Sequence, residues 1–149
     1  MGADPYWYFV PYEDPKIALR KLRQREFNAG RYYPAVDRPR FTRTKKPPSP
    51  GAQHKSIKEA LADADSEGAH SILDIARISP TPKFLCASPY DTETILKVLG
   101  HNKPTHEEII DPMNIFHLFR GIDRGQAVYL TIYRNKKPDE LFSYGYSVD

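Results

Sequence analysis

The chain has 149 residues, with 22 Lys and Arg against 19 Asp and Glu and a formal net charge of +3. This length is typical of a single domain spanning residues 1–149, and so small a positive charge does not by itself indicate a nucleic-acid-binding protein. No apolar run approaches the roughly 20 residues that a membrane-spanning helix needs, no secretory signal pattern is visible, and Cys86 has no second cysteine to pair with. We therefore expect a cytoplasmic protein without membrane contact.

The N-terminal residues predict a strand followed by a helix. Residues 6–12 are aromatic and β-prone and include Pro11, which stops the strand. Because both faces of this strand are apolar, we expect it inside a sheet rather than at its edge. Asp14 and Pro15 are typical of the N-cap and first position of a helix, and Gly30 of a C-terminal cap.

One carboxylate falls on the apolar face of this predicted helix. At 100° per residue, Leu19 and Leu22 share a face, and Glu26 follows one turn after Leu22. A desolvated carboxylate has a raised pKa unless a cation meets it, and such a group can act as a general acid or base. The sequence assigns no catalytic residue beyond this candidate. The alternatives are that Glu26 lies in the last helical turn, where the apolar stripe frays toward solvent, or that it forms an ion pair with Arg31 or Arg77.

Residues 31–55 predict a long, basic, proline-rich loop, because neither a helical nor a strand period survives there. Arginine and tyrosine often dominate contacts with a protein partner, so we expect this loop to bind an acidic protein. The candidate binding residues are Arg31, Tyr32, Tyr33, Arg38, Arg40, Arg43, Lys45 and Lys46. Two alternatives stay open: cations and aromatic rings also bind nucleic acid, and a solvated loop can simply dock on the acidic helix predicted at 56–67.

The middle of the chain predicts several short helices and strands. Capping boxes start helices at 56–67 and at 105–120, the second of which restarts at an Asp-Pro pair. Another helix is expected at 91–99, where an aspartate precedes it and a glycine follows it. The apolar runs 71–78 and 84–87 predict two buried strands.

The C-terminal residues predict a β-hairpin. Apolar residues alternate with other side chains over 128–133 and again over 141–148, on either side of a turn at 135–139. Tyr129 and Tyr133 share the face opposite the aliphatic residues of the first strand, so we expect both to be exposed. The element order predicts an α+β fold with a four- to five-stranded, largely antiparallel sheet and helices mainly on one face.

Signatures of a catalytic, cofactor or metal site are missing from the sequence. It contains no dinucleotide-binding, Walker, serine-hydrolase or Cys-x-x-Cys motif, and the five-residue spacing of His101 and His106 fits no tight metal motif. A site assembled from distant residues leaves no such signature, so whether the protein is an enzyme stays open. We expect neither a cofactor nor a metal.

These patterns favour a small macromolecule-binding protein of inhibitor, immunity or adaptor type that contacts an acidic protein. The first alternative is an enzyme acting on an anionic small molecule or nucleotide, with Glu26 as acid or base. The second is a nucleic-acid-binding protein that uses residues 31–55. The sequence leaves the oligomeric state open.

Overall fold

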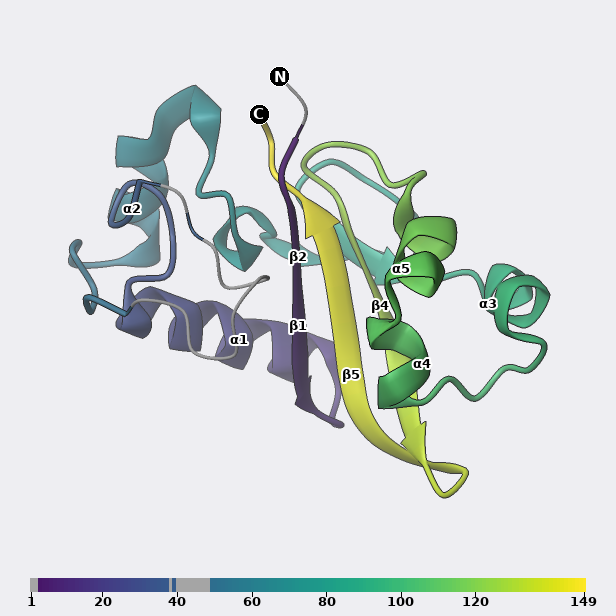
Figure 1. Cartoon of the computed structure of the whole chain (residues 1–149). Coiled ribbons are helices and arrows are strands. Elements are labelled where there is room, and N and C mark those ends of the chain that lie inside the picture. Colours follow the sequence, from purple (N-terminus) through teal and green to yellow (C-terminus); the bar gives the residue numbers. More distant parts are fainter. Residues whose placement is uncertain (1–2, 38, 40–48) are drawn as a thin grey trace.

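The computed structural model describes residues 3–37, 39 and 49–149. In these residues five strands form one mixed sheet in the order β1-β5-β4-β3-β2 (Figure 1). The strands are β1 (Pro5–Pro11), β2 (Arg77–Ile78), β3 (Cys86–Pro89), β4 (Ala127–Arg134) and β5 (Lys137–Tyr146). The helices are α1 (Pro15–Ala29), α2 (Ile57–Ala64), α3 (Thr92–Leu99), α4 (His106–Ile110) and α5 (Pro112–Phe119), with short 3-10 helices η1 (Asp65–Glu67) and η2 (Ile72–Asp74).

The α+β class is as expected, but the prediction of a largely antiparallel sheet is wrong. β5 is antiparallel to both β1 and β4, whereas β2, β3 and β4 are mutually parallel. The helices α3, α4 and α5 all lie between β3 and β4 in the chain. A crossover of this kind brings the chain back in its original direction and gives a parallel pair.

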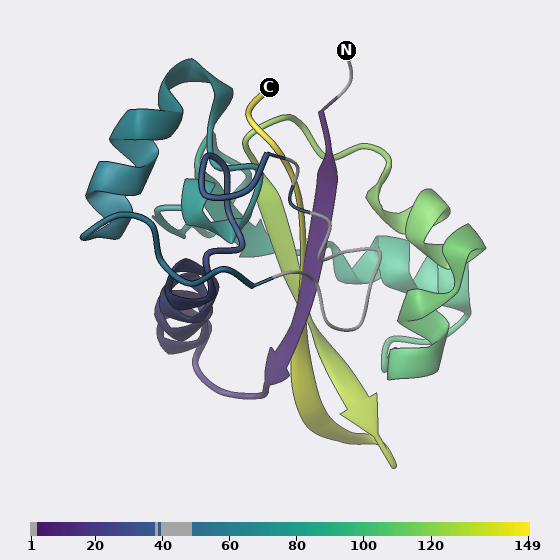
Figure 2. The same ribbon diagram turned by 60° about the vertical axis from the view of Figure 1, so that its left-hand side comes forward.

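The expectation of helices mainly on one face is also wrong, because the sheet is covered on both sides (Figures 1 and 2). α1, α2 and η2 pack on one face, where the core includes Tyr6, Tyr8 and Leu141. α3, α4 and α5 pack on the other, where the core includes Leu130 and Phe142. Successive residues of a strand point to opposite faces, so β1, β4 and β5 each contribute residues to both cores.

The first strand lies at one end of the sheet, which corrects the expectation that it lies inside. Tyr6 and Tyr8 are 1% and 5% exposed and belong to the α1 side. On the other side Trp7 stacks on Tyr144, and Phe9 stacks on His106 with 3.9 Å between ring centroids. An edge strand can therefore be apolar on both faces when helices cover both sides of its sheet.

Local capping signals place the helices correctly. The Asp14 carboxylate accepts hydrogen bonds from the Lys16 and Ile17 amides, and α1 ends at Gly30 with φ +73°. A Cβ at Gly30 would lie 2.1 Å from the Gly51 carbonyl oxygen, so this glycine is needed both for its backbone angle and for a close approach. The capping box of α4 is fully formed.

The second helix is shorter than expected. The Ser56 side chain caps α2 by accepting from the Glu59 amide, whereas the Glu59 carboxylate accepts from Lys55 rather than from Ser56. α2 ends at Ala64 and continues as the 3-10 helix η1 before Gly68. The hairpin of β4 and β5 is formed, and its turn is the two residues Asn135 and Lys136, both with positive φ.

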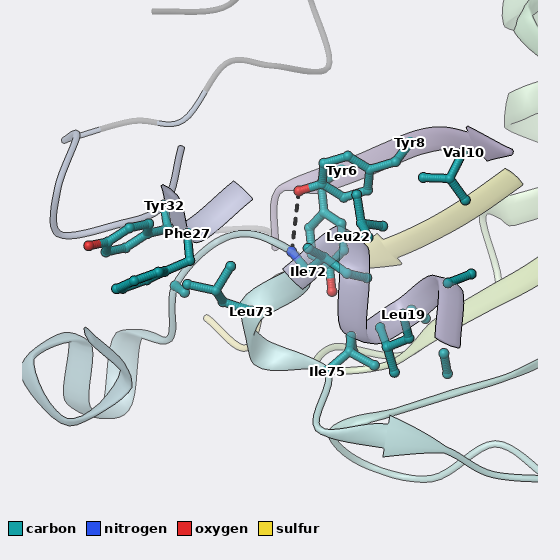
Figure 3. Packing of buried hydrophobic residues seen from close by; sticks show 14 of the residues in the cluster. Tyr6, Tyr8, Val10, Leu19, Leu22, Phe27, Tyr32, Ile72, Leu73 and Ile75 are labelled. Atoms are coloured by element: carbon teal, nitrogen blue, oxygen red, sulfur yellow. Dashed lines mark hydrogen bonds between the residues drawn. The ribbon is translucent and has the colours of Figure 1, made fainter. Parts of the chain in front are cut away.

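The strand expected over 71–78 is mostly wrong. The Ser71 hydroxyl accepts from the Leu73 amide and starts η2, so that only Arg77–Ile78 pair in the sheet. Ile72, Leu73 and Ile75 are all fully buried against α1 and β1, and the Tyr8 hydroxyl accepts from the Ile72 amide (Figure 3). Residues 71–75 are all buried, so they do not alternate between buried and exposed positions as the residues of a half-buried strand do. The next strand is also displaced, to Cys86–Pro89, and leaves Phe84 outside it and 58% exposed.

No helix in the described part of the chain is long and apolar enough to cross a membrane.

The packing of Tyr6 on Gly145 gives a test of the sheet. A Cβ at Gly145 would lie 2.7 Å from Cζ and from the hydroxyl oxygen of Tyr6, which is buried at this point. We expect Gly145→Ala to lower the free energy of unfolding by about 1–3 kcal/mol through overpacking. Urea denaturation measures this change.

The matched control is Gly121→Ala, because a Cβ there meets nothing within 4 Å. It should change the free energy of unfolding by less than about 0.5 kcal/mol. Equal effects of the two substitutions would contradict the packing described for Tyr6.

Candidate functional site

The segment at 31–55 begins and ends at the C-terminal end of α1. We call residues 31–37 its first stem and residues 49–55 its second stem. The Ala29 carbonyl accepts hydrogen bonds from the Ser49 hydroxyl and from the Gly51 amide, each at 3.0 Å. The two stems therefore lie side by side at the end of one helix.

Tyr32 joins the two stems from the inside. Its side chain is fully buried, and its ring stacks on Phe27 with 5.6 Å between centroids (Figure 3). Its hydroxyl lies 2.8 Å from Nδ1 of His54 and accepts from the Gln53 amide at 3.1 Å. This candidate binding residue is thus an anchor of the segment and offers a partner no surface of its own.

Arg31 holds the first stem to the helix by an ion pair with Glu26. Its Nε lies 3.0 and 3.1 Å from the two carboxylate oxygens, and its Nη2 lies 2.5 Å from Oε2. Arg25 approaches the same carboxylate with its Nε at 3.2 Å from Oε2. The hydrogen bonds to Glu26 raise the pKa of Arg31 above its ordinary value, so Arg31 stays charged and supplies the cation that a buried carboxylate needs.

The surroundings of Glu26 leave its carboxylate little freedom. The side chain is 2% exposed, and both oxygens accept hydrogen bonds from Arg31. A general base needs a lone pair that faces the proton it removes. The geometry is that of an ion pair which fixes the chain, and the partner is Arg31 rather than Arg77.

Tyr33 is the described candidate whose ring lies nearest the surface. It is partly exposed, its ring packs edge-on against His70, and its amide donates to the Ala69 carbonyl at 2.9 Å. The negative charge of Glu67 raises its pKa. The remaining candidates, Arg38, Arg40, Arg43, Lys45 and Lys46, lie outside the described residues.

The second stem is tied to the acidic helix that follows it. His54 Nε2 lies 2.9 Å from Asp63 Oδ2, and the Lys55 amide donates to Glu59 at 3.2 Å. One alternative for the segment at 31–55 is that it docks on this acidic helix. The second stem does contact the helix, through His54 and Lys55.

A buried polar cluster lies between α1, β1 and η2, and none of its residues is among the candidates predicted from the sequence. Asp74 is 5% exposed, and its Oδ1 accepts from the Ala69 amide at 2.7 Å. Among the described residues, Oδ2 of Asp74, the hydroxyl of Tyr6 and Nε of Arg23 are buried and have no hydrogen-bond partner. Burial raises the pKa of Asp74. The signal in the sequence is a single acidic residue inside an otherwise apolar run.

Two pockets that are lined by described residues adjoin Tyr129. One is an apolar slot of about 30 Å³ between α1 and the sheet, which has room for a water molecule and no more. The other is a polar pocket of about 190 Å³ beyond the end of β3. Glu26 is in the wall of neither.

The histidines are dispersed over the structure. His101 lies 2.7 Å from Glu108 and His106 lies 2.9 Å from Glu140, so each faces a different carboxylate. Across residues 3–37, 39 and 49–149, no group of three or more His, Cys, Asp and Glu side chains could hold a metal ion.

Comparisons with known proteins give this chain no family. No protein-family model, curated protein or solved structure matches it. Support for a function therefore comes from the residues themselves.

The Glu26–Arg31 pair predicts unequal effects of its two deletions. Arg31→Met removes the cation that bonds both oxygens of the buried Glu26 carboxylate, and we expect a loss of about 2–3 kcal/mol in unfolding free energy. Glu26→Gln leaves a cation that is 20% exposed, and we expect a smaller loss of about 1–2 kcal/mol. Urea denaturation of both variants and of the double variant gives the coupling energy. Additive losses would show that the two side chains do not interact.

Asp74 predicts a pH-dependent stability. Because its pKa is raised above 3.8 in the folded chain, ionisation costs stability as the pH rises from about 4 through the folded pKa. Asp74→Asn removes this ionisation, so its stability relative to the wild type should improve between about pH 4 and pH 7. Urea denaturation at several pH values measures the difference. A flat profile for Asp74→Asn would refute the assignment.

Proposed function

We propose that the protein acts by binding another protein that has an acidic surface, and that the contact is made by the segment at 31–55. The observation that carries this proposal is the anchoring of both stems at the end of α1, through Tyr32 and the Glu26–Arg31 pair. Between the stems, the sequence of residues 38–48 has five basic residues and no acidic one. The fold thus holds the two ends of a strongly basic segment at a defined place.

Anchoring matters for affinity because association costs conformational freedom. Each side chain or loop that is ordered only on binding reduces the affinity. The stems are already held by buried contacts, so ordering them costs no further conformational entropy when a partner binds. Arginines in such a segment can then form two-pronged hydrogen bonds with carboxylates of the partner.

The charges around the stems favour a protein over nucleic acid. Glu59, Asp63 and Asp65 are exposed on α2 and η1, next to the second stem. A long polyanion that follows the basic segment would meet these carboxylates, and repulsion would weaken its binding. An acidic patch of limited size on a protein can avoid them.

The enzyme alternative draws no support from Glu26. Its carboxylate is buried and its two oxygens accept from arginine. An anionic substrate at Arg31 would have to compete with this ion pair. We therefore retain protein binding as the proposed function.

The proposal predicts that charge reversal in the segment abolishes partner capture. In one variant Arg38, Arg40, Arg43, Lys45 and Lys46 are replaced by Glu, and tagged protein is used to capture partners from nuclease-treated lysate of the source cell, with identification by mass spectrometry. We expect a protein that the wild type captures, that is released as salt rises, and that this variant binds at least about tenfold more weakly.

The matched control reverses three arginines and two lysines that are exposed elsewhere, namely Arg20, Arg77, Arg134, Lys97 and Lys137. It has the same net charge as the test variant and should still capture the partner. Undiminished capture by the test variant would refute the contact, and loss of all capture on nuclease treatment of the wild type would favour nucleic acid.

A further inference from the structure

The polar pocket exists because β3 is shorter than the strand beside it. β3 pairs with β4 only as far as Pro89 opposite Tyr129, whereas β4 continues to Arg134. The Tyr90 amide donates to the Tyr129 carbonyl at 2.9 Å, and the chain then turns away into α3. Among the described residues, no strand pairs with the edge of β4 beyond Tyr129 on the β3 side.

The far side of this gap is closed by the loop before α4. The Tyr133 amide donates to the Pro104 carbonyl at 2.8 Å. Between the two contacts lies the pocket of about 190 Å³. Its wall consists of Pro89, Tyr90, Thr92, Ile95, Asn102, Pro104, Tyr129, Leu130, Thr131 and Tyr133.

Thr131 turns a backbone donor and a backbone acceptor toward the pocket. The Tyr129 carbonyl and the Tyr133 amide both bond on the side away from β5. Backbone groups of alternate residues in a strand point to the same side, and the register with β5 is regular from Ala127 to Ile132. The N–H and C=O of Thr131 therefore point to this side as well, beyond the last residue of β4 that pairs with β3.

The side chains of the wall suit a neutral ring with hydrogen-bonding edges. Three are tyrosines, two are threonines and one is Asn102, and the wall described here contains no Asp, Glu, Lys or Arg. The Tyr90 hydroxyl donates to the Leu118 carbonyl, which fixes its ring. Burial raises the pKa of Tyr129, and that of Tyr90 to about 12, so both rings are neutral at physiological pH.

The volume of this half-open pocket suits a ligand portion of about one ring. A cavity of about 150 Å³ accommodates a benzene-sized molecule, and this pocket is slightly larger at about 190 Å³. The aromatic rings of the wall offer faces for stacking, which every nucleobase can use. Thr131 through its backbone and Asn102 through its amide each offer a donor beside an acceptor, the pattern that pairs with the edge of a base.

We propose that this pocket binds a pyrimidine base, carried by a nucleoside or nucleotide. The ring stacks against the tyrosines, and its edge pairs with the backbone of Thr131 and the amide of Asn102. Lys103 lies between Asn102 and Pro104 of the wall in the chain, and its Nζ is 5.9 Å from the centre of the Tyr133 ring, where it can meet a phosphate. This site is independent of the protein contact proposed for the segment at 31–55.

Titration followed by NMR tests the proposal. Uridine, cytidine, uridine 5′-monophosphate, a five-residue oligouridylate and glucose are each added up to about 10 mM, which fills most of a site with a Kd of about 1 mM. We expect the pyrimidine nucleosides to shift the amide resonance of Thr131 and the side-chain resonances of Asn102. Asn102→Ala should weaken binding about fivefold or more, and Tyr12→Ala, which changes an exposed tyrosine outside the pocket wall, should leave it unchanged.

The remaining arms identify the source of the base. Tighter binding of the monophosphate, lost in Lys103→Gln, supports a free nucleotide, and tighter binding of the oligouridylate than of the monophosphate supports a base within single-stranded RNA. Binding of glucose as strong as that of uridine would overturn the assignment to a base. So would the absence of any shift at Thr131 and Asn102 with both nucleosides, or an unchanged affinity in Asn102→Ala.

Discussion

Both faces of the sheet are apolar, and the helices are arranged by the need to cover them. Tyr6 and Tyr8 of β1 face α1, while Trp7 and Phe9 of the same strand face the opposite side. Burying only one of these faces would leave the other in water at a cost proportional to its apolar area. The chain therefore places α1, α2 and η2 on one side and α3, α4 and α5 on the other. The segment at 31–55 is anchored at the end of α1, and the pocket beside Thr131 is closed by the loop before α4. Both sites therefore lie where a covering helix gives way to a loop.

The stems of the basic segment show how a fold can fix the ends of a long connection. Tyr32 is buried like a core residue although it lies outside any helix or strand, and its hydroxyl reaches the chain 21 and 22 residues further on. Glu26 and Arg31 hold the first stem by charge, at a point that is almost out of contact with water. Tyr32 and Arg31 are of residue types that often bind partners, but here they hold the segment in place.

The sequence predicts those parts of the structure that depend on neighbours in the chain. Asp14 and Gly30 bound α1 because caps act within a turn, and Arg31 could be named as a partner of Glu26 because it lies five residues away. The parallel pairing of β3 with β4 depends on a crossover of three helices, which no local pattern reveals. Residues 71–75 show no strand period because all of them are buried. The pocket beside Thr131 arises from the unequal lengths of two strands that are distant in sequence, so its residues share no motif.

The two edge strands, β1 and β2, also affect the association of one copy of the protein with another at high concentration. An open sheet presents unpaired backbone groups along its edges, and these can join to the edge of another copy and start aggregation. β2 contributes only Arg77–Ile78 to one edge, too few residues for a stable ladder. β1 carries a proline at each end, Pro5 and Pro11, and proline has no N–H to offer a neighbouring strand. The shortness of β2 and the two prolines of β1 thus limit edge-to-edge association.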